Sequence, residues 1–564
     1  MNNLIISVVS KTSYMQRIES LPADVCSLIA AGEVIDSLAA VVRELAENAL
    51  DAGATRIVIS VWPEQWRVRL ADNGIGMDWE NLQKCALAHT TSKIHQREDL
   101  WKIKSLGFRG EALHSVAQLS RLEICSRVSG EAGWRVFYNN LGEVLATEPA
   151  AIAPGTIVTV SDLFGPWQAR RSGLPSPAQQ LRTVQLMVHN LALCYPGVMW
   201  LVEQNDRQWF TISPGATQAH IMPQLLRDVR LQDLQYHQLE LGQNQGLEIV
   251  IGLPDRCHRH RLDWVKFAVN GRLVKCAEIE QTLLTSFSRT LPKDRYPICF
   301  VQLRVSPEQI DWNRHPAKAE IYLHNMSEWQ EIIGSGITQA LQLSNSHQPE
   351  AGQQRVGKLL KASEQKGGYT VSRSVEPAPK ESVLESLQLK AVAQIHNTYI
   401  LAEHPRGLWL IEQHIAHERV LYEEICERWQ LISLEVPVIL NKLSAVQIEN
   451  LQEIGIEIEV FGEQIWAARN APEMLANRED CAEAILEVSL GNLQAAQVAT
   501  ACRSAIRNGT KLSLAEMQLL IERWQNTKNP RTCPHGRPIY LSLEETALSR
   551  FFRRNWVVGK SHGI

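Results

Sequence analysis

The segment SLAAVVRELAENALDAGAT at residues 37–55 has the pattern of one amphipathic helix. Its apolar residues recur at helical spacing and predict a buried stripe, and Gly53 stands where a left-handed residue is expected to end the helix. Two carboxylates and an amide oxygen line a neighbouring flank, and they belong to Glu44, Asn48 and Asp51. This flank suits a hard cation that bridges phosphates, with one carboxylate left to activate water. A solvated acidic face is the alternative that the helix alone leaves open.

Two strings that contain glycine follow this helix. In the first, DNGIGM, Asp72 is followed by Gly74 and Gly76 directly after two strand-like segments, which would let the backbone approach a planar ligand closely. Alone, this string would more often be a plain turn. The second, SLGFRGEAL at 105–113, follows HTTSK at 89–93, and its main-chain N–H groups could hold a phosphate. Neither GxxxxGK(S/T) nor GxGxxG is present here, so this is no P-loop and no dinucleotide fingerprint.

In this order, the helix and the strings DNGIGM, HTTSK and SLGFRGEAL resemble the Bergerat (GHKL) ATP-binding fold. Gyrase-type topoisomerases, a heat-shock chaperone, sensor histidine kinases and MutL share that fold. The sequences IAAGEV and ELAENALDAGAT, together with the strings just named, are similar to motifs of the MutL mismatch-repair family in particular. The resemblance implies ATP as cofactor, Glu44 as the general base, Asn48 as the magnesium ligand, and adenine contacts from Asp72 and from Thr156 in APGTIVTV.

The resemblance assigns further residues to the nucleotide. They are Asp51, Gly74, Gly76, Thr90, Lys93, Gly107, Phe108, Arg109 and Gly110. The strings KFAVNGRLVK and QIDWNRHPAK look like those of the family's transducer domain, so Lys318 would reach the γ-phosphate. A buried structural lysine is the alternative. A lysine from a second domain on the γ-phosphate would link nucleotide state to the shape of the protein.

Some positions depart from the family. Asp36, Ser37 and Leu38 stand where a proline and an arginine are usual, GPWQARR replaces an Asn-Thr-Pro turn, and Trp312 and Arg314 replace valines. None of these changes touches a nominated catalytic group, so they bear on local loop geometry.

A second set of polar residues lies in the C-terminal part of the chain. EQHIAHERVLYEE at 412–424 reads as a strand end that runs into a helix, and it places His414 and Glu418 at i and i+4, where both can meet one metal ion. A salt-bridged surface helix is the alternative for this string alone. Cys533 and His535 in CPHGRP add a thiolate and an imidazole, which zinc- or manganese-type sites accept.

With ACRSAIR at 501–507 and FFRR at 551–554, these strings resemble the endonuclease-type MutL C-terminal pattern. The resemblance implies a zinc or manganese cluster that would nick DNA by metal-assisted hydrolysis of a phosphodiester. Its ligands would be Glu412, His414, Glu418, Cys533 and His535, with Cys502 nearby and Arg553 or Arg554 positioning phosphate. Glu412 replaces the family's aspartate and Ile415 its alanine, so the first ligand is one methylene longer and the geometry must shift by about a bond length.

The 564 residues predict several domains, because roughly 150 residues form one domain. We expect an α+β multidomain chain: a Bergerat-fold (GHKL) ATPase α/β sandwich at 1–215, a transducer domain of ribosomal-protein-S5-like type at 216–340, and an α+β C-terminal dimerisation and endonuclease domain at 390–564. The stretch 341–389 is rich in Gln, Ser, Lys, Glu, Gly and Pro, and has one aromatic residue, Tyr369. We predict that it is a disordered, flexible linker.

The charge balance, 57 Lys and Arg against 61 Asp and Glu, gives no overall attraction to nucleic acid. Sequence-independent binding of double- and single-stranded DNA would therefore depend on local basic residues, with Arg256, Arg259, Arg261, Arg272 and Lys275 as candidates. The 11 cysteines form no CxxC pair, which favours reduced thiols in the cytoplasm. The resemblance to the MutL family adds the expectation that the protein is associated with the nucleoid. No apolar run approaches the roughly 18 residues of a membrane span, so we expect no membrane partner.

The resemblance also implies partners, namely a second copy of the chain, the mismatch-recognition protein MutS and the replication sliding clamp. For the clamp, QLISLEVP near Gln430 is only a loose candidate, and a plain strand is the better interpretation. The expected function is an ATP-hydrolysing homodimeric clamp that couples mismatch recognition to strand removal and nicks DNA. The main alternative is an ATP-switched scaffold whose C-terminal domain only dimerises and binds metal structurally. A chaperone, kinase or topoisomerase is not favoured, because neither a phospho-acceptor histidine helix nor a DNA-cleaving tyrosine domain is recognisable.

Overall fold

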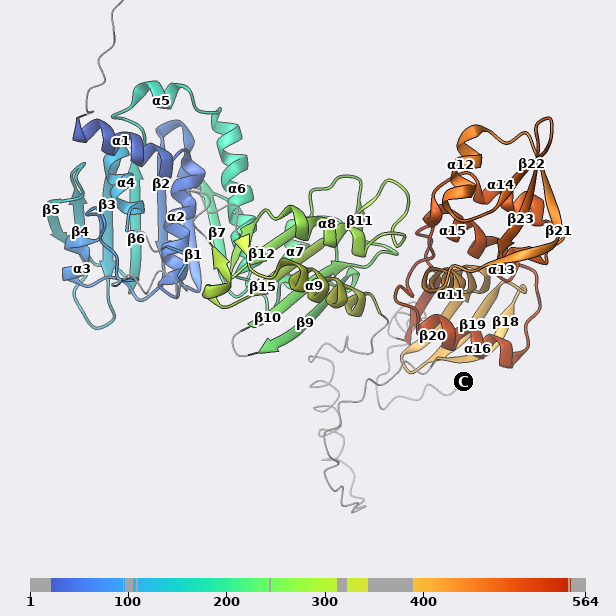
Figure 1. Cartoon of the computed structure of the whole chain (residues 1–564). Coiled ribbons are helices and arrows are strands. Elements are labelled where there is room, and N and C mark those ends of the chain that lie inside the picture. Colours follow the sequence, from blue (N-terminus) through green and yellow to red (C-terminus); the bar gives the residue numbers. More distant parts are fainter. Residues whose placement is uncertain are drawn as a thin grey trace, which may run out of the picture. The chain divides into compact units, whose positions relative to one another are not determined.

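The structure is a computed structural model, and it describes residues 22–94, 96, 105–107, 110–242, 245–311, 322–342, 389–545 and 548 (Figure 1). The chain divides into two compact units. The first comprises 1–227, 269–274 and 305–323, and the second comprises 228–268, 275–304 and 324–564. The predicted linker lies almost entirely outside the described residues, as do Phe108, Arg109, Lys318, Arg553 and Arg554.

The first unit is built on an eight-stranded sheet with the order β5-β4-β3-β6-β2-β1-β7-β8. Its strands are β1 (Arg56–Trp62), β2 (Arg67–Asp72), β3 (Arg121–Arg127), β4 (Trp134–Tyr138), β5 (Val144–Pro149), β6 (Gly155–Ser161), β7 (Met199–Gln204) and β8 (Arg207–Ile212). All neighbours are antiparallel except β1 and β7, which are parallel. Strands β1, β3 and β6 carry mostly buried residues, so the core of this unit lies along them.

The first unit also contains helices. They are α1 (Ala23–Val34), α2 (Leu38–Asp51), α3 (Trp79–Lys84), α4 (Ala112–Leu119), α5 (Gln168–Ser172), α6 (Pro177–Cys194) and α7 (Gln218–Leu225). Helix α2 packs on β1 and β2, and α4 packs on β3 (Figure 1). The predicted stripe of α2 is confirmed, because its residues Leu38, Val42, Leu45 and Ala49 are all buried. Ser37 accepts a hydrogen bond from Ala40 N and caps the helix, and Gly53 has the expected positive φ of 73°.

A five-stranded sheet follows in the order β13-β12-β15-β10-β9. Its strands are β9 (Leu234–Gly242), β10 (Gln245–Gly252), β12 (Val265–Val269), β13 (Arg272–Val274) and β15 (Cys299–Arg304). Helices α8 (Ala277–Ser286) and α9 (Met326–Leu341) pack against each other, and α9 contacts β9 and β10. The residues of β13 belong to the first compact unit, although the strand is an edge of this sheet.

The C-terminal segment has two sheets. The four-stranded sheet, β18-β19-β20-β24, consists of β18 (Lys390–Ile395), β19 (Tyr399–His404), β20 (Gly407–Glu412) and β24 (Tyr540–Glu544). The three-stranded sheet consists of β21 (Leu431–Asn441), β23 (Ile465–Pro472) and β22 (Ile458–Gly462). The helices are α11 (Gln413–Glu427), α12 (Ala445–Glu453), α13 (Glu473–Ala476), α14 (Cys481–Val488), α15 (Leu493–Ser504) and α16 (Leu514–Gln525). The expected plain strand after Gln430 is confirmed as β21.

Each C-terminal sheet has its own hydrophobic core. One core joins the four-stranded sheet to α11 and α16, with Trp409 and Trp524 at its centre. The other joins the three-stranded sheet to α12 and α14. The metal-site strings therefore lie on α11 and on the chain that leads into β24, both anchored by the first core.

Among the described residues, no single helix has the length and apolar character needed to cross a membrane. The bent pair of α1 and α2 meets those criteria by length and composition only. The predicted domain boundaries stay predictions.

Gly155 at the start of β6 offers a test of this fold. Its φ is 133°, and a Cβ added there would lie 2.1 Å from the carbonyl oxygen of Asp72. We expect Gly155→Ala to lower the free energy of unfolding by at least about 1–3 kcal/mol, because backbone strain and a clash with fixed backbone combine. Chemical denaturation of the full chain, with hydrogen exchange read in β2 and β6, measures the change.

Gly53→Ala is the matched control. Gly53 also has a positive φ, but nothing lies within 4 Å of its added Cβ. Only the cost of the left-handed conformation remains, about 1–2 kcal/mol. Equal destabilisation by both variants, with unchanged exchange in β2 and β6, would contradict the close approach of Gly155 to Asp72.

Candidate functional site

A pocket of about 650 Å³ lies in the first unit, over α2 and the ends of β2 and β6. It brings together most of the residues predicted for the nucleotide that the structure describes. Those that line it are Glu44, Asn48, Asp51, Asp72, Gly76, Thr90, Lys93, Gly107, Gly110 and Thr156. Gly74 does not line the pocket, but its N–H donates to Asp72 Oδ1 at 2.8 Å. The polar flank of α2 thus faces a pocket rather than open solvent.

Asp72 is a partly buried acceptor at one end of the pocket. Burial raises the pKa of its carboxyl group above the usual range, although backbone hydrogen bonds from Gly74 and Thr156 oppose this. Gly76 has a φ of 75°, and a Cβ there would lie 2.2 Å from the carbonyl oxygen of Arg127. Only glycine therefore lets the chain pass here, which leaves room for a planar ligand beside Asp72.

Ser126 is a fully buried residue that the sequence did not single out. Its hydroxyl lies 2.9 Å from Thr156 Oγ1, and it accepts a hydrogen bond from Met77 N at 2.8 Å. It therefore ties β3 to both the DNGIGM turn and β6, and orients the hydroxyl of Thr156. No motif signals this role, because the partners of Ser126 are 30 and 49 positions away along the chain.

Asp51 organises the other end of the pocket. Its Oδ1 accepts from Leu106 N at 2.9 Å, and its Oδ2 accepts from Gly107 N at 3.0 Å. The ammonium of Lys93 lies 2.5 Å from Asp51 Oδ2 and 3.2 Å from Asn48 Oδ1. The segment that opens the glycine-rich string is thus fixed to the C-terminal turn of α2.

These oxygen atoms fit a magnesium ion. Asn48, Asp51 and Glu44 supply amide and carboxylate oxygens, which this ion prefers. The Lys93 ammonium already lies against two of them, so the same donors accept a cation. Glu44 pairs with Arg43 at 3.2 Å, and its side chain is 19% exposed, so its carboxylate is accessible from the pocket.

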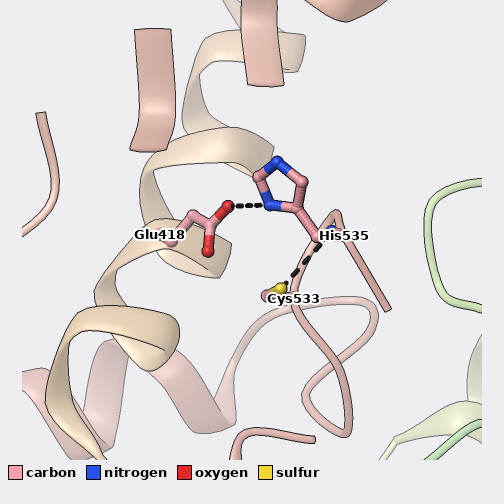
Figure 2. A group of neighbouring side chains, drawn as sticks. All are labelled: Glu418, Cys533 and His535. Carbon is pink, nitrogen blue, oxygen red and sulfur yellow. Dashed lines mark hydrogen bonds and ion pairs between the residues drawn. The ribbon is translucent and has the colours of Figure 1, made fainter. Parts of the chain in front are cut away.

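A second cluster lies in the C-terminal segment (Figure 2). The ligand atoms of Glu418, Cys533 and His535 all lie within 4.8 Å of one another. Helix α11 presents the carboxylate, and the loop before β24 presents the thiol and the imidazole. His535 Nδ1 lies 2.6 Å from Glu418 Oε1, and His535 N donates to Cys533 Sγ at 3.3 Å. Glu418 and Cys533 are fully buried, whereas the side chain of His535 is 45% exposed.

The charges in this cluster support one another. Hydrogen bonds with Cys533 and Glu418 raise the pKa of His535 to about 9. Burial opposes ionisation of the Cys533 thiol, but hydrogen bonds from His535 and Arg537 outweigh it and lower the pKa. Burial likewise opposes ionisation of Glu418, and His535 and Arg537 again lower its pKa. Arg537, which donates to Glu418 Oε2 at 2.9 Å, completes the set.

Two of the five predicted metal ligands lie outside this group of three. Glu412 Oε2 accepts a hydrogen bond from Ile415 N and caps α11. Its Oε1 is buried and has no hydrogen-bond partner among the described residues. His414 Nδ1 lies 3.0 Å from Ile506 O, and its Nε2 is 4.0 Å from Cys502 Sγ. Metal ligation by any of the five stays a prediction.

Known proteins match this chain along its whole length. The family model "Histidine kinase-, DNA gyrase B-, and HSP90-like ATPase" matches residues 36–146, "DNA mismatch repair protein, C-terminal domain" matches 229–342, and "MutL C terminal dimerisation domain" matches 392–512. The DNA mismatch repair proteins MutL of Nostoc punctiforme and Rippkaea orientalis are each 60% identical to it, over 97% of this chain and 99% of their own. The chain belongs to the MutL family of DNA mismatch repair proteins.

A more distant MutL, from Pelotomaculum thermopropionicum, is 31% identical over 93% of this chain and 98% of its own. The predicted fold class is confirmed: this MutL chain has mixed α/β sheets, an ATPase domain of the GHKL type and a separate C-terminal dimerisation domain. Because full-length relatives are MutL proteins, the alternatives of a chaperone, kinase or topoisomerase are excluded.

One candidate DNA contact of this MutL chain has a partner within the protein. The side chain of Arg272 is 10% exposed and pairs with Glu47 at 2.6 Å, and DNA binding by Arg272 stays a prediction. The sequence shows a basic residue in a turn, and it cannot show that a buried carboxylate 225 positions away requires it. Arg256 and Arg259 pair with Asp255 and Asp263, whereas Arg261 and Lys275 are exposed.

The raised pKa of His535 predicts how stability depends on pH. The folded-state pKa of about 9 lies above the ordinary value of 6.5, so the charged imidazole stabilises the fold fully below pH 6.5, and this stabilisation is lost as the pH rises through about 9. In excess chelator, the difference in free energy of unfolding between the parent chain and His535→Gln should shrink between pH 7 and 10. Chemical denaturation across that range measures it.

His396→Gln is the control, since His396 is an exposed histidine in the β18–β19 turn of the same segment. The difference in free energy of unfolding between the parent chain and His396→Gln should not decline above pH 7. A constant difference for His535→Gln over the same range would mean that the charge does not contribute.

Proposed function

We propose that this MutL-family chain is an ATP-hydrolysing homodimeric clamp that couples mismatch recognition to strand removal and nicks DNA through its C-terminal metal site. The observation that carries the proposal is that the Glu44, Asn48 and Asp51 flank opens into a pocket with a carboxylate acceptor at its far end. The grouping of Glu418, Cys533 and His535 supports the nicking step.

In the first unit, Asp72 would accept a hydrogen bond from the adenine amino group, with Thr156 beside it. Glu44 would take a proton from the attacking water. Asn48 and Asp51 would hold magnesium, which would neutralise phosphate charge when bound. The main-chain N–H groups around Gly107 and Gly110 would face the phosphates. Lys318, which lies outside the described residues, would reach the γ-phosphate.

Replacing the proposed base tests this assignment. Glu44→Gln should still bind a nonhydrolysable ATP analogue, but its turnover should fall by about 10²–10⁴-fold, because a general base contributes that much. Calorimetry with the analogue and a phosphate-release assay measure the two effects. Glu80→Gln on α3 is the control, since Glu80 is exposed and does not line the pocket. Turnover equal to the parent's in Glu44→Gln would refute the role of base.

The C-terminal cluster suits a metal ion of the zinc or manganese type. A thiolate, an imidazole and a carboxylate are ligands that such ions accept. The buried Oε1 of Glu412, at the N-terminus of the same helix, has no hydrogen-bond partner within the described part of the chain. A bound ion would supply a hydroxide at neutral pH. Arg537, half exposed beside Glu418, would attract the phosphodiester to this place.

A supercoiled-plasmid assay decides between nicking and scaffolding. With manganese or zinc added, the parent chain should open closed circles, and Glu418→Gln and Cys533→Ala should each do so at least about 10- to 100-fold more slowly, because they lose a ligand. Glu427→Gln is the control on the same helix, since its side chain is 65% exposed and pairs with Lys528. Intact circles with the parent chain and every ion would favour the scaffold, in which the C-terminal domain only dimerises and binds metal structurally.

The remaining partners are also proposals. MutS, the sliding clamp, and double- and single-stranded DNA follow from membership of the family, and a cytoplasmic, nucleoid-associated location fits them. The exposed Arg261 and Lys275 are available for phosphates.

A further inference from the structure

The turn between β12 and β13 is held rigidly in the first unit. Asn270 and Gly271 have φ values of 48° and 79°, which is the pair of positive values that an Asn-Gly turn of type I′ requires. The Asn270 side chain donates to Val305 O at 3.0 Å and accepts from Val305 N at 2.9 Å. A Cβ on Gly271 would lie 2.2 Å from the hydroxyl oxygen of Tyr195. The next residue, Arg272, is therefore delivered to a fixed place.

Arg272 lines the nucleotide pocket. Its terminal nitrogen lies 2.6 Å from Glu47 Oε2 and donates to the carbonyl oxygen of Leu106 at 2.8 Å. The side chains of Arg272 and Glu47 are only 10% and 6% exposed. Because a buried charge is costly without a partner, the pair is strongly constrained.

The loop that begins at Leu106 is thus held from both sides. Asp51 accepts from the N–H groups of Leu106 and Gly107, and Arg272 donates to the carbonyl of Leu106. Asp51 and Glu47 are one turn apart on α2, so the same helix carries both anchors. A residue that lies 166 positions beyond Leu106 in the sequence therefore helps to fix the loop expected over the phosphates.

We propose that Arg272 is a positioning residue for ATP turnover, which holds the Leu106 carbonyl so that the glycine-rich loop is set for the phosphates. This inference rests on the proposed ATPase function and adds a residue outside the family's four ATPase strings. If so, ATP turnover depends on the contacts that hold the β12–β13 turn in place. A shift of that turn would release the loop without touching Glu44, Asn48 or Asp72.

Three variants separate positioning from simple stabilisation. Arg272→Met removes the donor to Leu106 and keeps the apolar stem. Glu47→Gln removes the ion pair but leaves an acceptor beside Arg272, so the bond to Leu106 survives. Arg171→Met is the matched control, because Arg171 pairs with Asp162 at 2.7 Å in the same unit and does not line the pocket.

Each full-length variant is measured in three ways: hydrogen exchange in peptides that contain residues 105–107 without nucleotide, turnover at saturating ATP, and affinity for ADP. Arg272→Met should speed exchange at 105–107 and lower kcat by about 10- to 100-fold, because small misplacement of a reacting group costs that much. Its affinity for ADP should change less than about threefold, since the proposed adenine contacts of Asp72 and Thr156 are unchanged. Glu47→Gln and Arg171→Met should lose thermal stability but keep kcat within about threefold.

The proposal is overturned if Arg272→Met matches Arg171→Met in both exchange at 105–107 and kcat. If Arg272→Met does not fold, Arg272→Lys serves in its place. Arg272→Lys keeps a positive charge for Glu47, but its ammonium has a different shape from the guanidinium. We therefore expect kcat to fall while the thermal stability is largely retained. An unchanged kcat overturns the proposal. If the parent chain itself hydrolyses no ATP, the proposed function fails. Faster exchange at 105–107 in the variant would still support the seating of the loop by Arg272.

Discussion

The arrangement of the nucleotide pocket depends on the hydrogen bonds and the ion pair that the Asp51 carboxylate makes. This carboxylate accepts two backbone N–H groups from the loop at 106–107 and carries the ammonium of Lys93. A carboxylate that is only 11% exposed must be paired, because an unpaired charge in such a place is costly. Segments that are 42 and 55 positions away along the chain are therefore fixed against α2. The pocket exists because this one group requires several partners.

The same constraint shapes the C-terminal segment. Glu418 is fully buried on α11, and its two oxygen atoms face His535 and Arg537 from the loop before β24. That loop is held by backbone hydrogen bonds, such as Cys533 N to Arg537 O and Gly536 N to Cys533 O, and the ion pairs with Glu418 add to them. The geometry that makes Glu418, Cys533 and His535 a candidate metal site is thus also what satisfies a buried carboxylate.

Local patterns made much of this predictable, whereas long-range pairing did not. The stripe of α2, the left-handed Gly53 and the strand after Gln430 follow from spacing and conformational preference, which neighbouring residues determine. The buried roles of Ser126 and Arg272 could not be predicted, because their partners come from distant segments that only the fold brings together. At Glu412, the family resemblance implies a metal ligand, but it cannot show that one oxygen caps α11.

Both candidate sites pair their acidic oxygens with cations of the chain itself. Lys93 lies against Asn48 and Asp51, and Arg537 with the imidazole of His535 lies against Glu418. A metal ion that binds such oxygens competes with the positive groups already there. The free energy of metal binding is therefore the difference between the metal–oxygen interactions and the ion pairs that they replace. The side-chain cations keep the oxygens close together and would at the same time weaken the binding of a metal. Metal binding at either place would therefore be coupled to the movement of Lys93, or to the proton of His535 and the position of Arg537.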